Sequence, residues 1–172
     1  VHGGVDRELR VQSVRYLASL PFDGFAIGGS LGKDRAEMVE MLTWLMPQLP
    51  DDGRPNHLLG IADDESIAAV VPLGVDTLDS CNPTRVGRHG TLLTREGPIR
   101  IGGTKYAEDF GPIDPAGLGF EETGGLPYSR SYVHHLFKQN EPLALAIGAQ
   151  HNLRYMNDLM RRYREMILRD DI

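Results

Sequence analysis

An aspartate and two arginines lie close together near the middle of the chain. In residues 74–90, GVDTLDSCNPTRVGRHG, Asp79 ends a short apolar segment, and Arg85 and Arg88 follow the next proline. In parallel α/β proteins the carboxyl ends of the strands carry the functional loops, so an aspartate there can serve as a nucleophile or a general base. The alternative is that Asp79 caps the following turn, and the spacing alone favours the cap. Asp76, earlier in the same segment, is the weaker candidate because it would face the other side of the strand.

The two arginines are one helical turn apart. On a helix Arg85 and Arg88 would share a face, where they could bind a phosphate or a carboxylate; an exposed pair neutralised by local acids is equally consistent with the spacing. Another candidate is the pair Gly28 and Gly29, which would let a flat ligand approach the backbone or would simply form a turn. Together with Gly32, these glycines lack the spacing of a dinucleotide-binding loop, so a nucleotide-binding module is disfavoured.

The composition is that of a globular protein with one ordinary core. The chain has 172 residues, of which 41% are apolar and 24% charged, and its net charge is −6. The acidic balance argues against wholesale electrostatic binding of nucleic acid. A local basic surface remains open, formed by Arg85, Arg88, His89, Arg95, Arg100 and Lys105. Cys81 is the only cysteine, which excludes disulfides and multi-cysteine metal sites within the chain. No apolar run is long enough to cross a bilayer, so we expect no membrane insertion and an intracellular protein, cytoplasmic or organellar.

The first half of the chain alternates helical and strand patterns. We expect helices at residues 6–20, 33–46 and 63–71, and buried strands at 22–29, 57–62 and 75–80. This alternation predicts right-handed βαβ units and a parallel sheet. Three strands, with Val1 and His2 as the stub of a fourth, cannot close a barrel, and an open fragment would expose its edges. We therefore expect an N-terminal half or a partner chain to be missing; the start at valine likewise suggests a processed or truncated chain.

After Gly90 the pattern changes. Residues 91–101 predict a β-hairpin with its turn near Gly97, residues 111–127 a long loop rich in glycine and proline, and residues 129–140 and 142–172 two helices. In the last helix, large apolar residues recur at helical spacing and are expected to pack in the core. They are Leu153, Met156, Met160, Tyr163 and Ile167. We thus expect two domains, residues 1–90 with the strand ends, and residues 91–172 with the hairpin, the loop and the C-terminal helices.

Several motifs together resemble one known family. The segment GVDTLDSCNPTRVGRHGTLLT resembles the signature of the tRNA-guanine (queuine) transglycosylases around their nucleophilic aspartate. Further stretches match the same family in order: VHGG, FDGFAIGG, HLLGI, KYAED, GPIDP, YSRSYVHHL and HNLRY. The resemblance covers essentially the whole chain. It implies an α/β fold, the C-terminal portion of a (β/α)8 TIM-type barrel, followed by a β-hairpin and a helical subdomain that binds zinc in the family.

The resemblance implies base exchange in tRNA, a transferase reaction of queuosine biosynthesis. In the family a carboxylate attacks the ribose C1′ of the guanosine at the anticodon wobble position, guanine leaves, and a 7-deazaguanine base such as queuine or its precursor replaces it. The nucleophile corresponds to Asp79, and the Pro-Thr-Arg-x-x-Arg element that holds tRNA corresponds to Arg85 and Arg88. Gly28 and Gly29 correspond to the pair that lines the base pocket. An aspartate suits this reaction because it can trap an oxocarbenium-like centre and release it again.

The chain departs from the family at two motifs. The family binds zinc through Cys-x-Cys-x-x-Cys after an Asp-Pro, with a distant histidine as fourth ligand; here the Asp-Pro at residues 114–115 is followed by no cysteine, and only His151 matches. Structural zinc needs four good donors, so we expect no zinc and no other cofactor, with His151 a packed or helix-capping residue. In the Gln-Gly-Gly motif that contacts the incoming base, His2 replaces the glutamine before Gly3 and Gly4. Histidine still donates and accepts hydrogen bonds, so these three residues remain substrate-binding candidates.

Two functional hypotheses remain open. The family's base-recognising aspartates lie in the N-terminal half of the barrel, so we expect this chain alone to be inactive. In an enzyme, it would be the C-terminal half of a tRNA-guanine transglycosylase, completed by an N-terminal half or partner chain and assembled as a homodimer or hetero-oligomer. The intact Asp79, Arg85 and Arg88 favour this hypothesis. Alternatively, it belongs to a catalytically inactive paralogue, a structural or RNA-binding subunit of a larger complex, which the lost zinc cysteines and the acidic balance favour.

Overall fold

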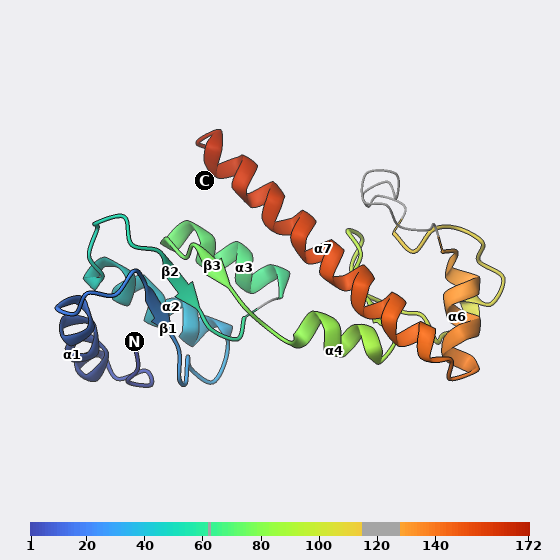
Figure 1. Cartoon of the computed structure of the whole chain (residues 1–172), viewed down its shortest axis with the longest axis horizontal. Helices are drawn as coiled ribbons and strands as arrows, with labels where there is room; N and C mark the ends of the chain where they lie inside the picture. The colour runs from blue at the N-terminus through green and yellow to red at the C-terminus, as the bar shows by residue number, and fades with distance from the viewer. Residues whose placement is uncertain (62, 115–127) are drawn as a thin grey trace. The chain divides into compact units, whose positions relative to one another are not determined.

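The computed structural model describes residues 1–61, 63–114 and 128–172, which form two compact units (Figure 1). The first comprises Val1–Ser80 and the second Cys81–Asp171. Both combine helices with a small sheet, so the fold is mixed α/β. The domain boundary expected at residue 90 stays a prediction.

The first unit is a three-stranded parallel sheet with helices between its strands. Its elements are α1 (Arg7–Ala18), β1 (Phe25–Ile27), α2 (Arg35–Leu45), the 3-10 helix η1 (Met46–Gln48), β2 (Asn56–Leu58), α3 (Asp64–Val70), η2 (Val71–Leu73) and β3 (Thr77–Leu78). The strand order is β1–β2–β3, with Ala26 opposite His57 and His57 opposite Thr77. The predicted alternation and parallel pairing are confirmed. Each strand is shorter than expected, because the residues at its two ends belong to the adjoining loops. Val1 is not part of a strand, but its carbonyl accepts from the Gly28 amide (3.1 Å), beside the end of β1.

Each α-helix of this unit begins at an aspartate. The side chains of Asp6, Asp34 and Asp63 each accept a hydrogen bond from an amide in the first turn of α1, α2 and α3, at 2.9, 2.9 and 3.0 Å. Such an N-cap satisfies a donor that has no partner within the helix and contributes about 1 kcal/mol. Local chemistry therefore decides where these helices begin.

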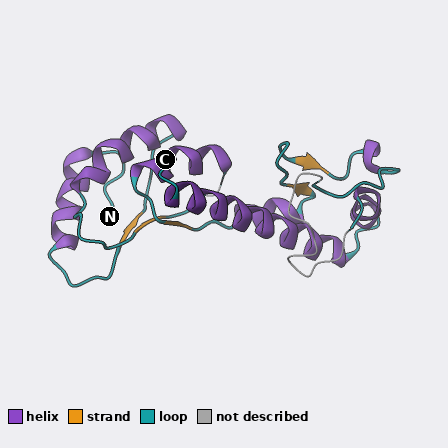
Figure 2. Cartoon of the chain, turned by 90° about the horizontal axis from the view of Figure 1, so that it is seen from above, coloured by secondary structure: helices purple, strands orange, loops and turns teal. Residues whose placement is uncertain are grey.

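The core of this unit lies on one face of the sheet. Phe25, Ile27 and Leu58 are buried there, and Figure 2 shows the helices of the unit gathered on one side of the strands. They pack with the α2 stripe expected from the sequence, Met38, Met41, Leu42 and Leu45. Because side chains alternate along a strand, the opposite face carries Ala26, His57 and Thr77, which are exposed or half-buried. Within this unit, the second face of the sheet is uncovered.

The second unit consists of helices and a β-hairpin. Its elements are α4 (Asn82–Arg88), β4 (Thr91–Leu92), β5 (Ile99–Arg100), the 3-10 helix η3 (Thr104–Tyr106), α6 (Arg130–Lys138) and α7 (Pro142–Leu168). β4 and β5 pair antiparallel, with Thr91 opposite Arg100, which confirms the predicted hairpin. The core contains Leu92, Ile101, Tyr106, Ile113, Val133, Leu136, Ala144 and Ile147. Most of the long loop expected at residues 111–127 lies outside the described residues. None of the described helices is both long and apolar enough to cross a membrane.

Helices α4 and α7 cross with their backbones in contact. A Cβ atom at Gly87 would collide with the carbonyl of Gly148, and a Cβ atom at Gly148 would collide with the carbonyl of Gly87. On the same helix as Gly148, the fully buried Asn152 accepts from the Leu93 amide (2.8 Å) and donates to the carbonyl of Pro83 (2.9 Å). Small and polar residues, rather than the largest apolar ones, thus form this contact.

The buried face of α7 differs from the predicted one. Among the residues expected in the core, Met156 is buried, but Leu153 and Ile167 are 47% and 53% exposed. The predicted stripe is therefore wrong at these two positions. The physical reason is that α7 contacts α4 through Gly148 and Asn152, and these residues lie on a face of α7 next to the row of large apolar residues. This face is buried because helices pack where their surfaces interlock most closely.

Candidate active site

Asp79 lies just beyond the end of β3, with its side chain 59% exposed. Its Oδ1 atom accepts a hydrogen bond from the Gly60 amide (3.2 Å) and lies 3.1 Å from the Nε2 atom of His57. The next helix, α4, has Cys81 as its N-cap, without a side-chain hydrogen bond. In the part of the chain that the structure describes, the Asp79 side chain accepts no hydrogen bond from the turn that follows it, so its interpretation as a cap of that turn receives no support; its carboxylate is held from β2 and the loop that follows β2.

His57, the middle residue of β2, has no predicted role but contacts two side chains of the neighbouring strand segment. Its Nδ1 atom lies 2.8 Å from the Thr77 Oγ1 atom, and its Nε2 atom contacts Asp79. The spacing of Thr77 and Asp79 along the chain could have indicated a shared face. The register that brings His57 to that face is a property of the assembled sheet, and no sequence pattern signals it.

Asp76, the weaker candidate nucleophile, has a structural role instead. Its Oδ2 atom accepts a hydrogen bond from the Asn56 amide (2.7 Å), and its own amide donates to the Asn56 carbonyl (2.9 Å). This reciprocal pair joins the segment before β3 to the first residue of β2. The two aspartates of this segment therefore serve different purposes.

The two glycine-containing loops predicted to bind the base lie against each other. Gly29 has φ +75°, and a Cβ atom there would lie 2.9 Å from the Nδ1 atom of His2. A Cβ atom at Gly28 would lie 2.5 Å from the Leu59 side chain, in the loop that leads to Gly60. Glycine leaves room for both contacts, and the positive φ of Gly29 favours glycine there as well. The structure thus brings His2 beside Gly29, as expected if both border one binding surface.

A buried arginine ties these loops together. Arg10 of α1 is completely buried and donates to the backbone carbonyls of Val1 (3.1 Å), Gly4 (2.5 Å), Gly28 (3.1 Å) and Ser30 (2.8 Å). Burial lowers the pKa of Arg10, while hydrogen bonds to the surrounding carbonyls favour its charged form. A planar fork of N–H donors can serve several carbonyls at once. Arg10 carries no predicted role because charged helix residues normally face solvent.

The loops after the three parallel strands meet at one edge of the sheet. Gly28 follows β1, Gly60 follows β2, and Asp79 follows β3. This is the edge at which parallel α/β folds bind their ligands. The predicted base-binding glycines and the predicted nucleophile therefore share an edge in the first unit, whereas Arg85 and Arg88 belong to the second.

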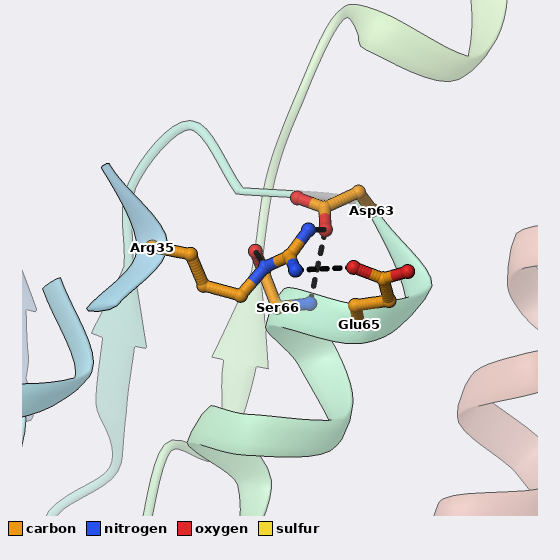
Figure 3. Close-up of polar contacts among 4 residues, drawn as sticks. All are labelled: Arg35, Asp63, Glu65 and Ser66. Atoms are coloured by element: carbon orange, nitrogen blue, oxygen red, sulfur yellow. Dashed lines mark hydrogen bonds and ion pairs between the residues drawn. The ribbon is translucent and has the colours of Figure 1, made fainter. Parts of the chain in front are cut away.

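A pocket of about 320 Å³ lies at the N-terminal ends of α2 and α3. Figure 3 shows Arg35 of α2 reaching to α3, where it donates to the Ser66 hydroxyl and the Asp63 carboxylate (both 3.0 Å) and pairs with Glu65. Burial alone would raise the pKa of Asp63, but hydrogen bonds from Ser66 and the charge of Arg35 hold this pKa below its ordinary value. Since Arg35 is neutralised by these acids, it contributes no unpaired charge to the pocket.

A family model described as Queuine tRNA-ribosyltransferase matches residues 1–172. The chain belongs to this family. Proteins named queuine tRNA-ribosyltransferase from Protochlamydia amoebophila, Chlamydia caviae and Chlamydia trachomatis serovar L2 are 48%, 45% and 42% identical to it. The alignments cover 99%, 100% and 100% of this chain, but only 43%, 45% and 45% of those proteins. The chain thus spans less than half the length of these relatives.

The residues at the position of the family's zinc site do not fit such a site. His151 lies inside α7, where its Nε2 atom is 2.8 Å from the Leu93 carbonyl oxygen, and burial lowers its pKa. It is a packed histidine and not a helix cap. Within residues 1–61, 63–114 and 128–172, no three His, Cys, Asp or Glu side chains converge to hold a metal. Residues 115–127 contain neither cysteine nor histidine, so a thiolate-rich donor set is lacking.

Arg85 and Arg88 lie on α4, and both are exposed, which confirms the predicted helical spacing. Arg85 donates to the side-chain oxygen of Asn82 (3.0 Å). In the part of the chain that the structure describes, neither arginine forms an ion pair with a carboxylate. The alternative of neutralisation by local acids therefore receives no support there.

Proposed function

We propose that this chain forms part of the active site of a tRNA-guanine transglycosylase, which exchanges the guanine at the anticodon wobble position for a 7-deazaguanine base. The observation that carries the proposal is the position of the Asp79 carboxylate, its exposure and its hydrogen-bond contacts. It follows a parallel strand, is exposed, and has its Oδ1 atom in contact with two donor groups. The name of the relatives, queuine tRNA-ribosyltransferase, supports the same class of reaction.

In this reaction Asp79 acts as the nucleophile. A carboxylate oxygen forms a bond to the ribose C1′ while the bond from C1′ to N9 of guanine breaks. The electron pair leaves with guanine, which takes a proton from water or from a carboxylic acid. The incoming base then gives up its N9 proton to water or a carboxylate, attacks C1′ and releases Asp79. Two displacements retain the configuration at C1′.

The base binds against Gly28, Gly29 and the segment of His2, Gly3 and Gly4. Two features support this assignment. Without side chains at residues 28 and 29, a flat base can approach the backbone closely. His2, beside Gly29, can donate and accept hydrogen bonds as the family's glutamine does.

The tRNA backbone binds at Arg85 and Arg88, because two exposed guanidinium groups on one helix face suit phosphate oxygens. The rest of the catalytic machinery comes from an N-terminal half or a partner chain. The uncovered sheet face with Ala26, His57 and Thr77 supports this, since further barrel strands would cover it. We infer that the chain alone does not turn over, that it works within a homodimer or hetero-oligomer, and that it binds no zinc.

The test is incorporation of labelled guanine into tRNA by the full-length natural protein and its Asp79→Asn variant. Asp76→Asn is the matched control, because it changes the neighbouring carboxylate, which the fold uses structurally. Exchange that survives in Asp76→Asn and disappears in Asp79→Asn supports the proposal. Exchange that survives in Asp79→Asn contradicts the assigned nucleophile.

The second candidate is an inactive paralogue that serves as a structural or RNA-binding subunit. The lack of cysteine in residues 115–127 favours it, because the family's zinc site has lost its thiolates. If the folded natural protein binds tRNA but performs no exchange, this second function is the correct one.

A further inference from the structure

His57 lies between the hydroxyl of Thr77 and the carboxylate of Asp79. The distances are 2.8 Å from Nδ1 to Thr77 Oγ1 and 3.1 Å from Nε2 to Asp79 Oδ1. Both contacting side chains belong to β3 and the residue that follows it. Strand β2 pairs with β3 in parallel, and His57 lies opposite Thr77. The imidazole is therefore held from two sides by one neighbouring segment.

The carboxylate sets the direction of these hydrogen bonds. An ionised aspartate only accepts, so the Nε2 atom of His57 must carry the proton that points to Asp79. In the neutral imidazole the Nδ1 atom is then an acceptor, and the Thr77 hydroxyl donates to it. The result is a chain of donors from Thr77 through His57 to Asp79.

The two oxygens of Asp79 consequently differ. Oδ1 receives the His57 contact and the Gly60 amide. Within the described ranges, Oδ2 accepts no hydrogen bond from the protein. A carboxylate held through one oxygen can present the other in a fixed direction, and such orientation is worth a large factor in rate.

We propose that His57 is a positioning residue of the transglycosylase reaction, which holds Oδ1 of Asp79 so that Oδ2 faces the ribose C1′. The inference rests on the proposed function, because it requires Asp79 to be the nucleophile. His57 itself touches neither the ribose nor the base in this role. It acts through the carboxylate, with Thr77 fixing its tautomer.

The residues around His57 leave Asp79 as its charged partner. The residue opposite His57 on β1, Ala26, carries no charge, and Thr77 on β3 is neutral. The nearby Asp76 carboxylate is engaged by the Asn56 amide. His57 therefore acts on Asp79 through their hydrogen bond.

The test compares kcat and KM for guanine exchange in the full-length natural protein and its variants. His57→Phe removes the donor and is expected to lower kcat about 10- to 100-fold, with KM for tRNA nearly unchanged. His57→Gln restores a neutral N–H donor, so it should recover most of kcat. A loss caused by changed packing alone would not be rescued by an amide donor. His135→Phe, at an exposed histidine of α6, is the matched control and should behave like the natural protein.

The outcomes separate this inference from the proposed function. If Asp79→Asn abolishes exchange but His57→Phe keeps the natural kcat, the positioning role is wrong and the proposed function stands. If Asp79→Asn retains exchange, the proposed function fails first. Should His57→Phe not fold, Thr77→Val tests the same chain of donors with a side chain of similar shape. It is expected to lower kcat several-fold, and an unchanged kcat in this variant would overturn the inference.

Discussion

Replacing Arg10 by methionine should loosen both base-binding loops at once. The guanidinium of Arg10 donates to the carbonyls of Val1, Gly4, Gly28 and Ser30. After the substitution, the Val1 carbonyl keeps a hydrogen bond from the Gly28 amide. The other three carbonyls lose the donor that the structure shows for them.

The size of the effect follows from these three carbonyls. A buried acceptor left without a partner costs about 1 to 3 kcal/mol. Removing the guanidinium also removes the cost of burying its charge, which offsets part of the loss. The Gly28 contact is buried and the Gly4 and Ser30 contacts are partly buried, so the low end applies to each carbonyl and gives about 3 kcal/mol at most for Arg10→Met. That value corresponds to roughly a hundredfold change in the equilibrium for opening the loops, since every 1.4 kcal/mol is about tenfold.

Hydrogen exchange measured by mass spectrometry in the full-length protein reports this opening locally. Peptides that cover residues 1–5 and 28–32 should exchange roughly a hundredfold faster in Arg10→Met. Arg15→Met is the matched control, because Arg15 lies on the same helix but is exposed. Arg10→Lys keeps the charge without the planar fork and should fall between the two. If Arg10→Met exchanges like the Arg15→Met control, the buried guanidinium does not hold these loops and the reasoning is refuted.

Three further predictions concern the second unit. Gly87→Ala should lower the stability of the protein by about 3 kcal/mol, because its Cβ atom would collide with Gly148. The control is Gly102→Ala, whose Cβ atom would meet nothing within 4 Å. Equal melting temperatures of the two variants would contradict the close crossing of α4 and α7. Burial lowers the pKa of His151 from 6.5, so the unfolded chain takes up a proton at a higher pH than the folded chain does. The free energy of unfolding should therefore be unaffected by His151 above about pH 6.5 and should fall as the pH drops below that value. His151→Gln should reduce this acid loss in urea unfolding measured from pH 7 to 5, and an unaltered pH dependence would show that His151 is not its source. Elemental analysis of the purified full-length protein should find zinc far below one ion per chain, and stoichiometric zinc retained through chelator treatment would overturn the inferred loss of the site.

The sequence by itself determined the local features of this protein. The helices α1 to α3 begin at aspartates that cap them, and α2 buries the apolar stripe expected from its periodicity. The hairpin of β4 and β5 forms around the predicted turn. These features depend on residues a few positions apart, so their patterns can be read along the chain. The order of the motifs likewise indicated the family that the whole chain matches.

Only the tertiary structure decided which distant residues meet. The contact of His57 with Asp79 depends on the register of β2 against β3, and the burial of Arg10 depends on carbonyls from two separate loops. The buried face of α7 depends on Gly148 packing against Gly87, which overrides the row of large apolar residues. In each case the partners lie far apart in sequence. Their meeting is set by strand register and by the fit of packed surfaces, and local periodicity carries no information about either.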